Sequence, residues 1–194
     1  MPKLIDHAQR RIEIAEALWR VVSRDGVAAA SVRDVAAEAG ISAGSLRHVF
    51  ATKEELLAFS MELIYERVAA RVRTHATKRD PLRRAEAVLA EVLPLDDNRR
   101  IEMHVNLALV TEAAAHPALA RAGVQAHEGL RELCRGVLAD LADHGLVAAS
   151  RDLDAESMHL HALVDGLAVH LLLGHNDRPT RVRRLIVDHL ASLR

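Results

Sequence analysis

The chain has few aromatic side chains, a single cysteine and no long apolar run, and each shortage excludes a class of protein. Its four aromatic residues are Trp19, Phe50, Phe59 and Tyr65, so the core beyond residue 65 is expected to be aliphatic. The lone Cys134 cannot form an internal disulfide, which fits a reducing compartment. No run approaches the roughly 18 apolar residues that a membrane-spanning helix requires.

An excess of charge of one sign is also missing. Lys and Arg total 26 against 27 Asp and Glu in 194 residues, so no global field marks a nucleic-acid or membrane partner. The first residues carry charges throughout and lack the apolar core of a signal peptide. We therefore expect a cytoplasmic protein that makes no membrane contact.

Helix-forming residues are what the chain has in abundance. Half of the residues are apolar, mainly Ala, Leu and Val, and β-branched runs are few, which predicts an all-α fold. Apolar residues recur at helical spacing between Gly and Pro residues that end or begin helices. The pattern predicts about nine helices, over residues 8–24, 32–39, 43–49, 53–77, 81–93, 97–115, 117–143, 155–173 and 179–193.

The stretch AGISAGSL, residues 39–46, ends one helix and begins another almost at once. Gly40 suits the left-handed position after a helix, and Ser42 suits the N-cap of the next one. In a helix-turn-helix, one short helix crosses the DNA backbone while the next presents its N-terminal residues to the major groove. Ala43 and Gly44 are small, so the second helix could approach base edges closely.

Polar and basic side chains surround this turn. Ser45 adds a short hydroxyl, and His48 lies on the same short helix. Arg33 can form a fork onto guanine, whereas Arg47 and Lys53 are better suited to phosphate. Residues 1–60 carry eight Lys or Arg against eight Asp or Glu, so the basic character is local. On these features alone, ordinary helix caps in a bundle remain an equal explanation.

Residues 8–60 resemble the N-terminal domain of the TetR family of transcriptional regulators. The resemblance is carried by the Ala-Leu-Trp core of the first helix, the run GVAAASVRDVAAEAGIS, the short SLRHVF helix and the segment TKEELL. It implies a DNA-binding domain at residues 1–55 and a larger effector-binding and dimerisation domain at residues 56–194. With Ser42 added from the local pattern, the expected contacts to double-stranded operator DNA are Ser31, Arg33, Ser42, Ala43, Gly44, Ser45, Arg47, His48 and Lys53.

One position departs from the family pattern. The family usually carries Tyr where Arg47 stands, as part of a Tyr-x-x-Phe signature, whereas Phe50 keeps the aromatic core position. We expect Arg47 to hold phosphate with a charge where the tyrosine would use a hydroxyl.

The C-terminal region resembles regulators related to the repressor of betaine synthesis, which responds to choline. Quaternary ammonium groups are recognised by aromatic faces, yet Tyr65 is the only aromatic residue beyond position 60. An aliphatic or weakly polar small-molecule effector is therefore expected in place of choline. Candidate effector contacts, for which ordinary helix packing is the competing explanation, are Tyr65, His104, Asn106, Leu107, Val110, Thr111, His161 and Asp165. His161 and Asp165 stand one helical turn apart and are expected to form a buried polar pair.

The last two predicted helices are candidates for a subunit interface. Residues 155–173 are apolar on nearly all sides, and residues 179–193 carry one apolar stripe. A helix buried on two sides needs a second partner. The resemblance implies a homodimer through these two helices, and paired operator half-sites require a two-fold protein. A central core helix of a monomer is the alternative.

Twelve histidines suggest a metal site, but their spacing does not support one. No His-x-x-x-His pair lies on a predicted helix, and no carboxylate cluster completes a ligand set. Cys134, Ser157 and the histidines form no ordered catalytic set. We therefore expect no metal, cofactor or enzymatic activity. What the family resemblance implies is a transcriptional regulator, expected to be a repressor released from DNA by a small-molecule effector. A metal-binding or enzymatic bundle with a borrowed N-terminus, or an assembly protein that does not read DNA, remain the alternatives.

Overall fold

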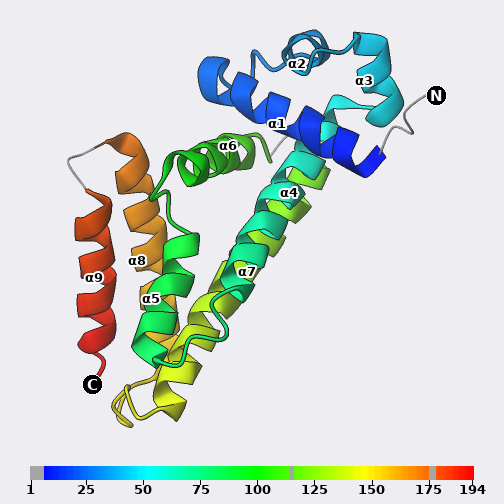
Figure 1. Ribbon diagram of the computed structural model, residues 1–194. Coiled ribbons are helices and arrows are strands. Elements are labelled where there is room, and N and C mark those ends of the chain that lie inside the picture. The colour runs from blue at the N-terminus through cyan, green and yellow to red at the C-terminus, as the bar shows by residue number, and fades with distance from the viewer. Residues whose placement is uncertain (1–6, 114–115, 175–177) are drawn as a thin grey trace. The chain divides into compact units, whose positions relative to one another are not determined.

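The computed structural model describes residues 7–113, 116–174 and 178–194, and its regular structure in those ranges is entirely α-helical (Figure 1). The prediction of an all-α fold with about nine helices is confirmed. None of the described helices is both long and apolar enough to cross a membrane. The helices are α1 His7–Asp25, α2 Val32–Glu38, α3 Ala43–Val49, α4 Lys53–Arg73, α5 Pro81–Glu91, α6 Asp97–Glu112, α7 Pro117–Asp143, α8 Leu153–Leu173 and α9 Pro179–Ala191.

Several predicted helix ends need correction. Helix α4 ends at Arg73 and does not reach residue 77, because the next residues form tight turns, as in the bond from Thr74 N to Arg71 O. Helix α8 begins at Leu153, before the predicted residue 155, because the Asp152 carboxylate accepts the early backbone N–H groups. Helices α5 and α9 stop at Glu91 and Ala191. The predicted end at residues 114–115 lies outside the described residues.

The described residues divide into two compact units. The first unit contains the residues up to Glu66 and those between His104 and Val124, and the second contains Arg67–Met103 and the residues from Gln125 onward. Three helices, α4, α6 and α7, therefore contribute residues to both units.

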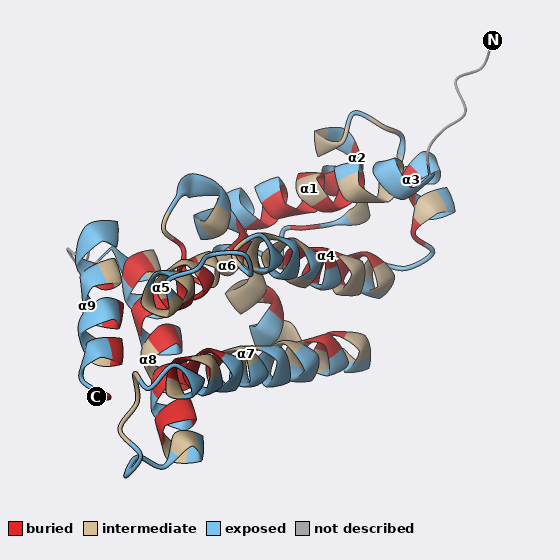
Figure 2. Ribbon diagram, turned by 60° about the horizontal axis from the view of Figure 1, so that its bottom comes forward, coloured by how far each residue is buried: buried red, intermediate tan, exposed pale blue. Residues whose placement is uncertain are grey.

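The first unit is built around α1. Figure 2 shows the buried residues of this helix in red, recurring along its length, and α1 packs against both α2 and α3. Phe50 and Phe59 lie with their ring centroids 5.4 Å apart, and the Arg11 guanidinium covers both rings at 4.3 and 4.5 Å. Arg11 also donates to Glu55 at 3.1 Å. Two of the four aromatic residues thus help to join α1, the end of α3 and α4.

The second unit has an aliphatic core, as the sequence predicts. Most of its buried side chains come from α5, α7, α8 and α9, and they include Leu89, Leu138, Leu160, Ile186 and Cys134. Burial raises the pKa of the Cys134 thiol to about 12. A thiol with such a pKa stays protonated and behaves as a small apolar group.

A network of ion pairs holds the end of α4 within the second unit. Arg71 donates to both oxygens of Glu102 on α6, at 3.1 and 2.7 Å, and to Glu91 on α5 at 3.1 Å. Arg99 and His75 contact the same Glu91 carboxylate at 3.1 and 2.9 Å. Because Glu102 is buried, the two-pronged contact with Arg71 supplies the hydrogen bonds that its charge requires.

Candidate nucleic-acid interface

Helix α2 begins at a serine cap. Ser31 has an extended backbone, and its Oγ accepts the Asp34 backbone N–H at 3.3 Å. The Ser31 hydroxyl donates in turn to the Asp34 carboxylate, and this hydrogen bond lowers the pKa of Asp34. Arg33, next in the first turn, has an exposed side chain. The expected start of this helix at Ser31 is confirmed.

The turn between α2 and α3 depends on Gly40. Its φ of +66° lies in the left-handed region, where a side chain is strained. The Gly40 N–H donates to Ala37 O at 3.1 Å, and the Ile41 N–H donates to Ala36 O at 2.9 Å. This pair of bonds is a Schellman motif, which satisfies the last carbonyls of α2 while reversing the chain. The left-handed backbone at this position therefore explains why the sequence has a glycine between the two helices.

Helix α3 is short and presents its polar residues to solvent. It covers Ala43–Val49, as predicted, and Ser42 caps it by accepting the Ser45 N–H at 3.0 Å. The two serine hydroxyls lie 2.9 Å apart. On its inner side, Leu46 is buried and holds the helix in place. The outward residues Ser42, Gly44, Ser45, Arg47 and His48 are exposed, and Ala43 is half-buried.

Helix α4 starts immediately after α3 with its own capping box. Thr52 Oγ1 accepts the Glu55 N–H at 3.0 Å, and Glu55 Oε2 accepts the Ala51 N–H at 3.0 Å. The half-buried Lys53 occupies the first helical position.

Three cations of the first unit differ from other cations nearby in their ion pairing. Among the described residues, no ion pair involves Arg33, Arg47 or Lys53. By contrast, Arg11 pairs with Glu55, and Arg20 pairs with Glu38 at 2.6 Å. The unpaired cations are those that the sequence assigns to DNA, and a phosphate could approach them without breaking an existing contact.

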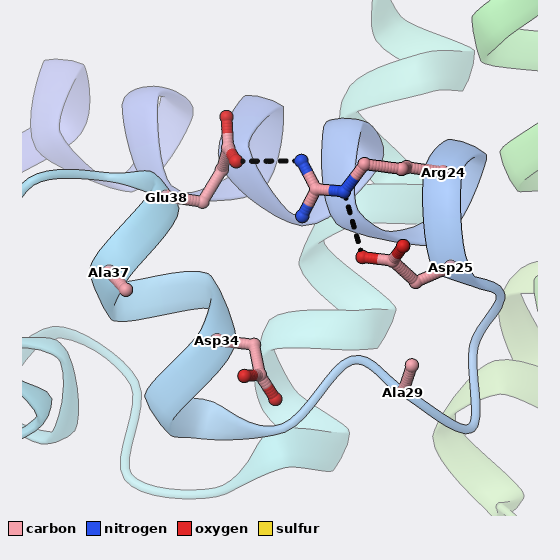
Figure 3. A pocket seen from close by; sticks show the side chains of 6 residues that line it. All are labelled: Arg24, Asp25, Ala29, Asp34, Ala37 and Glu38. Carbon is pink, nitrogen blue, oxygen red and sulfur yellow. Dashed lines mark hydrogen bonds and ion pairs between the residues drawn. The ribbon is translucent and has the colours of Figure 1, made fainter.

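A depression of about 500 Å³ lies between the end of α1 and α2 (Figure 3). Arg24 spans it, donating to Asp25 at 2.9 Å and to Glu38 at 3.1 Å. Hydrogen bonds from Arg20 and Arg24 lower the pKa of Glu38. Asp34 adds a third carboxylate to the lining. Carboxylates outnumber guanidinium groups here, so this depression repels phosphate, and its contacts serve to hold α2 against α1.

Two of the effector candidates in the first unit are joined by a hydrogen bond. The Tyr65 hydroxyl donates to Asn106 Oδ1 at 2.6 Å, and burial raises the pKa of Tyr65 to about 12. Leu107 is half-buried, whereas His104, Val110 and Thr111 are exposed. The Thr111 hydroxyl donates to Ala108 O of its own helix at 2.7 Å.

The candidates on α8 belong to the second unit. The expectation of a buried pair is correct for His161 and wrong for Asp165, because Asp165 lies on the exposed side of the helix. Their Nε2 and Oδ2 atoms are 3.3 Å apart. Sequence reasoning missed His127 on α7, whose ring lies 4.8 Å from that of His161. No local pattern links residues so far apart in the chain. Within the described ranges, no three His, Cys, Asp or Glu side chains are arranged to hold a metal ion.

Comparisons with known proteins match two successive parts of the chain to two family models. Residues 14–59 match the family described as bacterial regulatory proteins, tetR family. Residues 81–194 match the family described as BetI-type transcriptional repressor, C-terminal.

Individual relatives match most or all of the chain. The chain is 39% identical over 196 residues to the HTH-type transcriptional regulator PksA of Bacillus subtilis, covering 100% of this chain and 94% of that protein. It is 30% identical to the regulator BetI of Paraburkholderia phytofirmans, covering 86% and 84% of the two chains. A solved transcriptional regulator from Rhodococcus sp. Rha1 superposes with a TM-score of 0.81 at 29% identity, over 94% of this chain and 95% of that one.

Proposed function

The chain belongs to the TetR family of bacterial transcriptional regulators, and on that premise we propose that it is a repressor whose α3 helix enters the major groove of its operator. TetR regulators bind operator DNA, typically as dimers. Since the relatives are named as regulators and not as enzymes, the catalytic and metal-binding alternatives are set aside.

One observation carries the assignment of the DNA contacts. The outward face of α3 is polar and exposed, and the cations around it, Arg33, Arg47 and Lys53, have no carboxylate partner among the described residues. In a mixed-charge unit, unpaired cations gathered at one helix-turn-helix are suited to phosphates. Ser42, Ala43, Gly44 and Ser45 would then face base edges, with Ser31 and His48 flanking them.

Exposed apolar residues support the part of the proposal that places the dimer interface on α8 and α9. On α8, Met158, Val169 and Leu173 are exposed although Leu160 and Val164 of the same helix are in the core. On α9, Leu185 is likewise exposed. Apolar side chains on the outer face of two neighbouring helices are typical of a subunit interface. A monomer with α8 as its central helix would leave these side chains in water.

For the effector, we propose an aliphatic or weakly polar small molecule bound within residues 56–194, with residues 1–55 forming the DNA-binding domain. The second unit contains no Phe, Tyr or Trp, which disfavours a quaternary ammonium ligand. Tyr65, Asn106 and His161 are the candidates with hydrogen-bonding groups away from bulk solvent. An effector that prefers one orientation of α4 would shift the population away from the DNA-binding state.

A competition gel-shift assay on the DNA flanking the chain's own coding region tests this function. We expect retardation at moderate salt that survives an excess of random duplex and is weakened when Arg33 is replaced by Ala. Binding that random duplex removes equally well, or no binding at all, would contradict a sequence-specific regulator.

A further inference from the structure

Positive charge is concentrated in two segments of the second unit. Residues 78–86 and 178–194 together hold nine Lys or Arg and three Asp or Glu, a net charge of +6, whereas the rest of the chain carries −7. The helices in these segments, α5 and α9, pack against each other (Figure 1). A nearly neutral protein thus concentrates basic residues in two segments that do not include its helix-turn-helix residues.

A groove of about 500 Å³ lies between these two helices. Leu82, Val187 and Leu190 give it an apolar lining, while Arg83, Arg183 and Arg184 and the hydroxyl of Thr180 provide polar groups; we call it the basic groove. Its volume falls within the roughly 300–1,000 Å³ that small-molecule sites occupy.

Each arginine of the basic groove lies within ion-pair distance of a carboxylate, but only one of these contacts is shorter than 3 Å. Arg83 and Arg183 share Glu86, at 3.4 and 3.9 Å, and the second distance is too long for a hydrogen bond. Arg184 pairs with Asp188 at 2.8 Å on the exposed surface. The neighbouring Arg84, by contrast, binds Asp140 through two nitrogens at 3.0 and 2.6 Å.

The remaining carboxylate of the groove already accepts a backbone hydrogen bond. Asp80 caps α5 by accepting the Arg83 backbone N–H at 3.1 Å. Beside the groove, Arg181 has no ion pair among the described residues. An incoming anion could therefore bind Arg183 without displacing a close contact, since the Glu86 oxygen is 3.9 Å away.

We propose that the basic groove binds an anionic amphiphile, that is, a carboxylate or phosphate head group joined to an apolar chain. Guanidinium groups bind such head groups with two parallel hydrogen bonds. The apolar lining is what separates this ligand from a bare anion, which would leave Leu82 and Val187 uncovered. A neutral apolar ligand would not require three arginines.

Calorimetric titration with decanoate, below its micelle concentration, tests the proposal on the full chain. We expect saturable binding of decanoate, binding of decanol at least about tenfold weaker because it lacks the charge-assisted hydrogen bonds, and no binding of acetate. Equal affinities for decanoate and decanol, or no binding of decanoate, would overturn the proposal.

Substitutions of lining residues test whether decanoate binds in the basic groove. Arg183→Gln with Arg184→Gln should weaken decanoate binding by about tenfold or more, and Val187→Asp should weaken it similarly through the apolar lining. Arg131→Gln on α7, an exposed arginine of the same unit, is the matched control and should change nothing. Circular dichroism confirms that each variant is folded. Decanoate binding that survives the double substitution lies in another pocket and would contradict the assignment.

Anionic phospholipid is the other source of the same chemistry. Sedimentation with phosphatidylglycerol vesicles should leave the protein in the supernatant at moderate salt, because a groove of about 500 Å³ is too small for the two long acyl chains of a phospholipid. Pelleting with vesicles in the absence of decanoate binding would identify the patch as a surface that attracts membranes and would refute a small-ligand site. Neither result depends on whether the chain binds DNA.

Discussion

Arg47 stands on the exposed face of α3 where relatives of this family usually carry a tyrosine. Its guanidinium has no ion-pair partner among the described residues, so its charge is available to a phosphate. A charge that neutralises a phosphate releases counterions, whereas a tyrosine hydroxyl does not.

We predict that Arg47→Ala weakens binding to all duplexes and lowers the slope of log affinity against log salt by about 1. Arg47→Tyr should recover affinity at moderate salt while keeping the lower slope. Fluorescence anisotropy over a salt series measures both, with Arg131→Ala as a control. An unchanged slope in the Arg47→Ala variant would count against the phosphate contact.

Tyr65 is the only tyrosine in the chain, so its ionisation can be followed alone. Burial raises its pKa from 10.0 to about 12 in the folded protein. A raised pKa means that the folded state binds the proton more tightly, so its stabilising effect is complete below pH 10 and is lost as the pH rises towards 12.

A pH-jump experiment read by phenolate absorbance should therefore show half-ionisation near pH 12 before unfolding and near pH 10 in urea. Tyr65→Phe should flatten the fall in stability between those values. Ionisation near pH 10 in the folded protein would show that Tyr65 is solvated and would remove the Asn106 contact from the candidate site.

At the scale of the element, the turn between α2 and α3 sets the direction in which α3 leaves the turn. Gly40 adopts a φ of +66°, and a Cβ added there would meet no atom within 4 Å, so strain alone opposes a side chain. Gly136, inside α7, also has open space but no positive φ. The two glycines make a matched pair.

We predict that Gly40→Ala lowers the free energy of unfolding by about 1 kcal/mol, whereas Gly136→Ala raises it by up to about 1 kcal/mol through helix propensity. Gly40→Ala should also weaken DNA binding, because the strain tilts α3. Urea unfolding and anisotropy measure the two effects. If the two variants change stability and DNA affinity in the same way, the turn does not constrain α3.

Local chemistry explains which elements could be predicted. The caps Ser31, Ser42 and Asp80 act within their own first turns, so their sequence patterns locate the starts of α2, α3 and α5 correctly. The end of α4 has no such marker, and the prediction overran it. Helical spacing places His161 and Asp165 on one side of α8, but only packing decides which of them is buried.

Contacts between distant segments could not be predicted from the sequence, because packing decides them too. Nothing local pairs Tyr65 with Asn106, or the ring of His127 with that of His161. The domain limits at residues 55 and 56 stay a prediction. The residues that contact DNA or effector also stay predictions, because they concern partners of the chain.

At the scale of the whole molecule, the exposed apolar residues of α8 and α9 support the proposed interface with a second copy. Met158 and Leu173 are 69% and 63% exposed, which is unusual for large apolar side chains on a helix that also carries core residues. Covering them in a two-fold interface would also pair two α3 helices for two half-sites.

We predict that the double change Met158→Glu and Leu173→Glu converts the protein to a monomer, because two charges would be buried at the interface. Val124→Glu, at a position 58% exposed on α7, is the control and should leave the dimer intact. Sedimentation equilibrium distinguishes the 21.3 kDa chain from its dimer. A dimer that persists in the double variant would place the interface elsewhere.

The central claim is that α3 reads a major groove twice in one two-fold assembly. Selection of bound duplexes from a randomised library tests it without knowledge of the natural operator. Ser42→Asp is the control, since it keeps a capping side chain on α3 but sets a carboxylate against the phosphates. We expect an enriched motif with two-fold symmetry for the unaltered chain and none for the Ser42→Asp variant. An asymmetric motif, no enrichment, or the same motif from both proteins would contradict this claim.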